Sequence, residues 1–297
     1  MRAYCVALTK PWPADGQREQ FVEDLAGKLV ARGVHTLLIP DIYQIRPHSE
    51  AFSILRRLDQ PLIVGSWLKP RAAFWTLRVM GVGGPPPEAP KGTPQPELVC
   101  VDLSERSCPG KWVEDLQQRF GGGFPGGTGK LIRAKGTSAD RWYPVIDQER
   151  CQNCHECAEF CLFGVYEKTT DGNIRVANPD ACKPGCPACS RVCPAQAIMF
   201  PLCDEDDAIA GAENAVIKPF DPATLAQIQK HRAKEKARQK REEPPVLVRG
   251  KGAAQALAAG CNCSKEAPAD QKRSGSPARQ KHDDAYFDDV IGGLVKE

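Results

Sequence analysis

Eight of the fourteen cysteines in this 297-residue chain lie in two short blocks, and this pattern constrains the fold more than any other feature. The first block contains Cys151, Cys154, Cys157 and Cys161, and the second contains Cys182, Cys186, Cys189 and Cys193. In each block three thiols share a short loop, and a fourth follows about one helical turn later, so that it points away from them. A cubane of iron and sulfide needs four thiolates. The spacing therefore indicates two iron–sulfur sites.

The two blocks belong to an internal duplication. The interval between their first cysteines equals the interval between their last cysteines to within one residue. Extended segments are expected before the blocks at 142–147 and 173–177, and after them at 164–166 and 197–200. The sequence therefore predicts two copies of a strand, short helix and strand, arranged as a βαββαβ unit.

This segment resembles the bacterial ferredoxin domain with two [4Fe-4S] clusters, over roughly residues 140–203. The resemblance implies that each triad holds one cluster and that the fourth cysteine of each block reaches the other cluster. The implied ligands are Cys151, Cys154, Cys157 and Cys193 for the first cluster, and Cys182, Cys186, Cys189 and Cys161 for the second.

The segment departs from the family pattern at two places. Leu162 stands where the first motif usually has proline, which removes a rigid stop after the short helix but no ligand. Three residues, not two, separate Cys182 from Cys186, because Pro184 and Gly185 form an insert. We expect the insert to reshape the loop over the second cluster while all eight ligands remain.

Zinc and disulfides are the alternative interpretations of these cysteines. Zinc takes four tetrahedral ligands, usually from pairs of closely spaced cysteines, and two triads with a trailing fourth fit that less well. Disulfides suit exported proteins, and the amino end of the chain does not resemble an export signal. His155 is expected to be a solvent-facing loop residue. The apolar shell that excludes water from the clusters is expected to include Tyr143, Phe163, Tyr166 and Phe200.

Residues 1–103 alternate apolar segments with segments of helical periodicity. Strands are expected at 4–8, 34–39, 62–65 and 98–101, with helices at 21–33, 49–58 and 70–80. This order predicts an α/β domain with a parallel sheet, in a flavodoxin-like or Rossmann-like layout. The first loop lacks the glycines that admit a pyrophosphate, and Asp41 is expected to cap a turn. We therefore expect no nucleotide site in this domain.

The rest of the chain is predicted to be linker and tail. Residues 104–139 are expected to be a glycine-rich linker with a short helix, 204–243 an acidic turn and a basic helix, and 244–297 a mostly disordered tail. No aromatic residues interleave the basic helix, which favours a solvated face. An apolar stripe near the carboxyl end is either a docking segment or a fraying terminus; it comprises Tyr286, Phe287, Val290, Ile291 and Leu294.

The functional hypothesis is a non-enzymatic electron carrier or relay subunit with two [4Fe-4S] clusters, protein redox partners and no catalytic residues of its own. Net charge of +3 and the absence of a long apolar run predict neither a nucleic-acid partner nor a membrane span. Oxygen-sensitive clusters predict a cytoplasmic location. Two alternatives stay open. In the first, the chain is an oxidoreductase whose amino-terminal domain binds a small-molecule substrate or flavin. In the second, it is a partner-binding scaffold held together by structural clusters.

Overall fold

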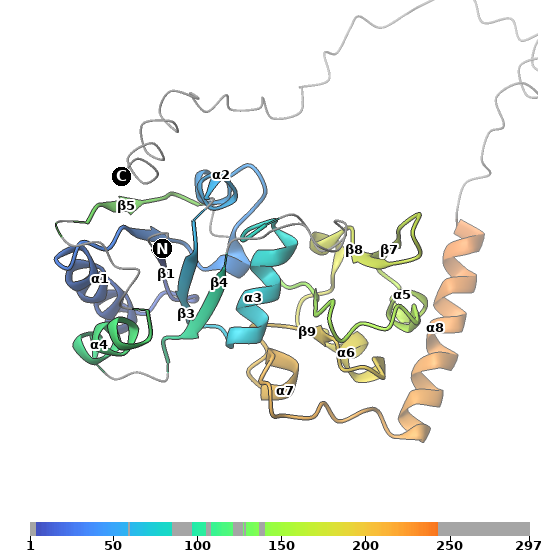
Figure 1. Ribbon diagram of the computed structural model, residues 1–297. Coiled ribbons are helices and arrows are strands. Elements are labelled where there is room, and N and C mark those ends of the chain that lie inside the picture. Colours follow the sequence, from blue (N-terminus) through green and yellow to red (C-terminus); the bar gives the residue numbers. More distant parts are fainter. Residues whose placement is uncertain are drawn as a thin grey trace, which may run out of the picture.

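The computed structural model describes residues 4–58, 60–84, 97–104, 108–120, 127, 129–136 and 140–242. These residues form an amino-terminal α/β domain, a small cysteine-rich domain beside it and a long helix beyond (Figure 1). The expected disordered tail at 244–297 lies outside the described residues. Within the described part of the chain, no helix is long and apolar enough to cross a membrane.

A five-stranded parallel sheet forms the core of the amino-terminal domain, which confirms the predicted fold class. The strands lie in the order β4-β3-β1-β2-β5. They are β1 (Cys5–Thr9), β2 (Thr36–Ile39), β3 (Leu62–Ser66), β4 (Leu98–Asp102) and β5 (Leu131–Arg133). Every residue of β1, β2 and β3 is buried, because a parallel sheet of this kind is covered on both faces. Their continuous apolar sequences reflect this burial.

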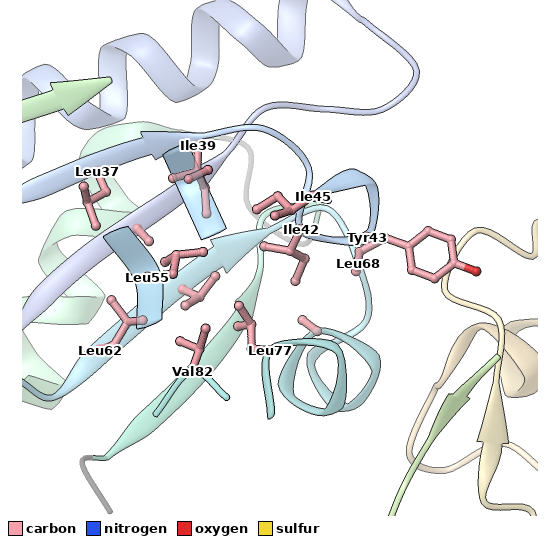
Figure 2. Close-up of a cluster of buried hydrophobic side chains, with 14 of the residues drawn as sticks. Leu37, Ile39, Ile42, Tyr43, Ile45, Leu55, Leu62, Leu68, Leu77 and Val82 are labelled. Carbon is pink, nitrogen blue, oxygen red and sulfur yellow. The ribbon is translucent and has the colours of Figure 1, made fainter. Parts of the chain in front are cut away.

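Helices cover both faces of the sheet. One face carries α1 (Gly16–Val30) and α4 (Pro109–Phe120), and the other carries α2 (Glu50–Arg57) and α3 (Pro70–Val79). Figure 2 shows the core on the face of α2 and α3, where the turn η1 (Ile42–Gln44) also packs. From this turn the side chain of Tyr43 extends toward the cysteine-rich domain (Figure 2).

Two elements of the sheet domain lie within residues 104–139, which the sequence analysis interprets as a linker. The short helix expected there is α4, and its apolar side packs against α1. The edge strand β5 pairs with β2. An added Cβ on Gly129 would lie 2.2 Å from the carbonyl oxygen of Val34, so this glycine permits close backbone contact. The described residues of this segment therefore contribute one helix and one edge strand to the sheet domain.

The cysteine-rich domain has the predicted βαββαβ order. Two antiparallel pairs form it, β6 with β9 and β7 with β8. Its elements are β6 (Val145–Ile146), α5 (Glu156–Phe160), β7 (Tyr166–Lys168), β8 (Ile174–Val176), a single turn η3 (Pro179–Ala181), α6 (Ala188–Val192) and β9 (Ile198–Met199). The chain continues through α7 (Asp207–Ala210) into the basic helix α8 (Pro222–Glu242).

Helix α3 lies between the sheet and the cysteine-rich domain (Figure 1). The segment after β9 returns to this helix, where Gly211 packs against Ala72. An added Cβ on Gly211 would lie 2.9 Å from the Cβ of Ala72 and 3.0 Å from the sulfur of Met199. The φ of +105° at Gly211 also favours glycine. The two domains are therefore in tight contact along α3.

Candidate metal centres

The loop that carries the first triad begins at a buried aspartate. The Asp147 carboxylate accepts hydrogen bonds from the backbone N–H groups of Glu149 and Arg150, and its carbonyl accepts one from Cys151. Farther along, Asn153 and His155 have φ values of 53° and 64°. These left-handed residues, which are uncommon outside glycine, turn the loop so that its cysteines face the same hollow.

The first hollow brings together the four cysteines that the ferredoxin resemblance assigns to the first cluster. They are Cys151, Cys154, Cys157 and Cys193. The rest of the lining is largely apolar and includes Ile146, Ile174 and Ile198. The fourth cysteine of this hollow thus comes from the other block.

The second triad lies on a loop that contains the insert. Lys183, Pro184 and Gly185 are exposed, and Gly185 has a φ of +70°, which glycine adopts without strain. The indole N–H of Trp142 donates to the carbonyl of Cys186 at 3.3 Å. The insert therefore projects into solvent, while its carboxyl end is held against the domain.

The second hollow repeats the arrangement of the first. Its cysteines are Cys161, Cys182, Cys186 and Cys189. The wall around them includes Pro144, Phe160, Phe163, Val165 and Tyr166. Each hollow therefore has three cysteines from one block and one from the other.

Hydrogen-bond donors reach several of the sulfurs. The Tyr166 hydroxyl donates to Cys189 Sγ at 3.1 Å. The backbone N–H of Ala197 lies 3.4 Å from Cys193 Sγ, and that of Phe163 lies 3.4 Å from Cys161 Sγ. Donors of this kind stabilise negative charge on a thiolate ligand and help to set the potential of an iron–sulfur cluster.

The electrostatics of the metal-free thiols support the two groupings. Burial, followed by the proximity of Cys193 and Cys151, raises the pKa of Cys157 to about 12. Burial, followed by the proximity of Cys186 and Cys161, raises the pKa of Cys182 to about 12. Without metal these thiols keep their protons at neutral pH, so metal binding must displace them.

A single tetrahedral metal ion and a cubane place different demands on four thiolates. A tetrahedral zinc with Zn–S bonds of about 2.3 Å holds its sulfurs roughly 3.8 Å apart, whereas the thiolates of a cubane bind separate irons. Among the described residues, no group of three His, Cys, Asp or Glu side chains could hold one metal ion directly. Every cysteine in the same part of the chain is also free of disulfides. The four cysteines around each hollow form a donor set that an iron–sulfur cluster can take.

Residues outside the two triads only partly match the expectations. His155 is half-buried, and its Nε2 lies 2.9 Å from the carbonyl oxygen of Gly172, so it holds the loop to the β7–β8 turn and does not face solvent freely. Phe163 lines the second hollow but is 41% exposed, so it shields the site less than expected. Phe160 is buried beside the second hollow, and Phe200, one of the expected shell residues, is fully buried and stacks on Trp142.

Helix α3 supplies a buried cation to the first site. Arg71 Nε lies 2.6 Å from Asp147 Oδ2, and both side chains are almost fully buried. Arg71 Nη2 also donates to the carbonyl of Gln196, three residues after Cys193. One arginine of the α/β domain therefore joins the starting point of the first loop to the segment that follows Cys193.

The η1 turn of the α/β domain contacts residues 141 and 143 of the cysteine-rich domain, on the side of the second hollow. The rings of Tyr43 and Tyr143 stack with centroids 4.1 Å apart, and the Tyr43 hydroxyl donates to the Tyr143 carbonyl. Arg141 pairs with Asp180, which precedes Cys182, and donates to the carbonyl of Ile45. These contacts pack the two domains against each other. The sequence analysis missed this interface because no local pattern marks such long-range contacts.

Comparison with known proteins supports the identity of this domain. An uncharacterized ferredoxin of Methanocaldococcus jannaschii is 46% identical over 61 residues, which are 20% of this chain and 41% of that protein. The pyruvate synthase subunit PorD of the same organism is 34% identical over 70 residues, or 24% of this chain and 79% of the subunit. No family model and no solved structure matches the chain.

The chain belongs to the ferredoxin family through its cysteine-rich domain. It covers less than half of the first relative's length and most of the second's. The matched segments are short, and three quarters or more of this chain lies outside each of them. The similarity therefore identifies an iron–sulfur domain of the ferredoxin type, a class that transfers electrons.

Proposed function

We propose that this protein transfers single electrons between redox partners through two [4Fe-4S] clusters. The observation that carries this proposal is the pair of hollows, each lined by three cysteines of one block and one of the other. Cys151, Cys154, Cys157 and Cys193 would bind the first cluster. Cys182, Cys186, Cys189 and Cys161 would bind the second. When bound, each cluster supplies a one-electron couple.

The surrounding residues position the ligands and set the environment of each site. Burial raises the pKa of Tyr166 well above its usual value, so the phenol keeps its proton and donates to Cys189. The apolar walls restrict the access of water, which affects the potential. The ion pair between Arg71 and Asp147 fixes the first loop from the side of the α/β domain. The protein itself makes and breaks no substrate bond in this proposal.

The partners in this proposal are oxidoreductase proteins. PorD, one of the relatives, is a subunit of pyruvate synthase. By that similarity we propose that this chain acts as a carrier or relay subunit and forms a complex with an oxidoreductase. A reducing cytoplasm suits the clusters and is part of the proposal. The packed α/β domain would give the ferredoxin domain a fixed orientation toward such a partner.

An anaerobic reductive titration, followed by absorbance and electron paramagnetic resonance, tests the proposal. Two reversible one-electron reductions per chain are expected from two [4Fe-4S] clusters. Clusters that cannot be reduced and re-oxidised would contradict electron transfer and favour the scaffold. A flavin spectrum in the purified protein would favour the oxidoreductase.

A further inference from the structure

A groove lies between the two domains, separated from the two cysteine-lined hollows by residues 144–146. It has a volume of about 380 Å³. One wall comes from α2 and the end of α3, and includes Phe52, Arg56 and Val79. The other wall comes from residues 143–146 and 175–176 of the ferredoxin domain. Its size is at the lower end of the range for binding sites, roughly 300–1,000 Å³.

The groove is apolar and bears only positive charge. Three arginines line it, Arg56, Arg141 and Arg175, and no aspartate or glutamate does. Arg141 pairs with Asp180 and Arg175 with Glu167, whereas the Arg56 guanidinium stacks on the Phe52 ring at 5.6 Å. Among the described residues no carboxylate pairs with Arg56. Val79 is 49% exposed on this face. An occupant should therefore combine apolar side chains with negative charge.

We propose that this groove is the docking site of the chain's own carboxyl-terminal segment, residues 283–294. The segment contains the apolar stripe defined above, with four aspartates among and before its members and no lysine or arginine. The aspartates are Asp283, Asp284, Asp288 and Asp289. A cavity of about 150 Å³ accommodates one benzene ring, so the groove has room for about two rings, such as those of Tyr286 and Phe287. Charge and apolar content are therefore complementary.

Chain length permits this contact. About 40 residues separate the end of α8 from the segment, and at ~3.3 Å per extended residue they could span more than 100 Å. A segment tethered to its own site also has an effective concentration on the order of 1 mM. Intramolecular docking therefore requires only modest intrinsic affinity.

Docking in the groove would cover the strand between the groove and both cysteine sites. Pro144, Val145 and Ile146 line the groove. Pro144 also lines the second hollow, and Ile146 also lines the first. The docked segment would therefore lie one strand away from both proposed clusters. The docking itself does not depend on the identity of the metal centres.

The test compares the full chain with a chain that ends at His282, both purified anaerobically. The probe is a fluorescein-labelled synthetic peptide of residues 283–297, and binding is measured by fluorescence anisotropy. In the full chain the tethered segment competes with the peptide. For an intrinsic Kd of about 0.1 mM, the apparent Kd of the peptide should therefore be about tenfold higher for the full chain than for the shortened chain. Arg56→Glu in the shortened chain should weaken binding at least fivefold, while Arg32→Glu, an equal charge change on an exposed residue of the opposite sheet face, should leave it unchanged.

A second peptide keeps the test independent of protein folding. In this peptide asparagine replaces the four aspartates, and its binding to the shortened chain should be at least fivefold weaker than that of the native peptide, as for Arg56→Glu. The proposal is overturned if the shortened chain fails to bind the native peptide at 1 mM, or if both chains bind it equally. It is also overturned if the asparagine peptide binds as well as the native one. Equal binding by both chains would instead assign the groove to a separate partner.

Discussion

Replacing Arg71 with leucine would break the most buried ion pair between the two domains. The guanidinium lies 2.6 Å from Asp147, and the two side chains are only 7% and 5% exposed. It also donates to the Gln196 carbonyl at 3.0 Å. Leucine fills part of the space but leaves the carboxylate and this carbonyl without their buried donor. The variant therefore measures how strongly the α/β domain holds the first metal centre.

The expected cost follows from the burial of the pair. Removing one partner of a buried ion pair costs about 3–5 kcal/mol, because the remaining charge is left without compensation. Asp147 would keep its hydrogen bonds from the Glu149 and Arg150 backbone, and Arg150 Nε lies 3.5 Å from its carboxylate. These contacts place the cost at the lower end, about 3 kcal/mol. Adding Asp147→Asn to the Arg71→Leu variant should recover part of this lost stability, because asparagine carries no charge and can still accept the backbone hydrogen bonds.

Urea unfolding of the anaerobic holoprotein, followed by circular dichroism, measures this cost. The matched control is Arg133→Leu, which removes an ion pair to Glu23 whose side chains are 58% and 39% exposed. Exposed pairs contribute about 0–1 kcal/mol. If Arg71→Leu costs no more than Arg133→Leu, the buried pair does not hold the domains together and the reasoning fails.

Three further predictions concern single residues. Cys161→Ala should perturb the second cluster and Cys193→Ala the first in electron paramagnetic resonance spectra of the reduced protein; the reverse assignment would refute crossed ligation. Tyr166→Phe should lower the potential of the second cluster by up to about 40 mV in a redox titration, because a hydrogen bond of about 1 kcal/mol to a ligand sulfur is lost. An unchanged potential would contradict this role. Burial raises the pKa of Asp41 to about 7, so this residue should make the folded protein less stable as pH rises from about 4 to 7. Between about pH 5.5 and 7.5, the free energy of unfolding measured in urea should fall by roughly 2 kcal/mol more in the wild type than in Asp41→Asn. The same pH dependence in both proteins would argue against a raised pKa of Asp41.

The sequence predicts the parts of the fold whose signals are local. Continuous apolar strands indicate the parallel sheet, and the duplicated cysteine blocks indicate the βαββαβ unit. Asp41 caps a turn as expected, since its carboxylate accepts from the Tyr43 backbone. The two predicted sets of four cysteines come together in the structure because loop turns and short helices of fixed length bring them to the two hollows.

Long-range contacts leave no such signal. Arg71 and Asp147 are far apart in the chain, and neither stands in a recognisable motif. Strand β5 has only three residues and follows a glycine-rich run, so composition alone indicates a linker. Exposure is equally hard to predict, because the neighbours that would bury Phe163 depend on how the domain packs. Tertiary packing decides these features.

The metal content of the anaerobically purified chain tests the central claim most directly. Two [4Fe-4S] clusters predict about eight irons and eight acid-labile sulfides per chain, with little zinc. Half of this amount would mean that only one site holds a cubane. Stoichiometric zinc without acid-labile sulfide would contradict the iron–sulfur assignment altogether.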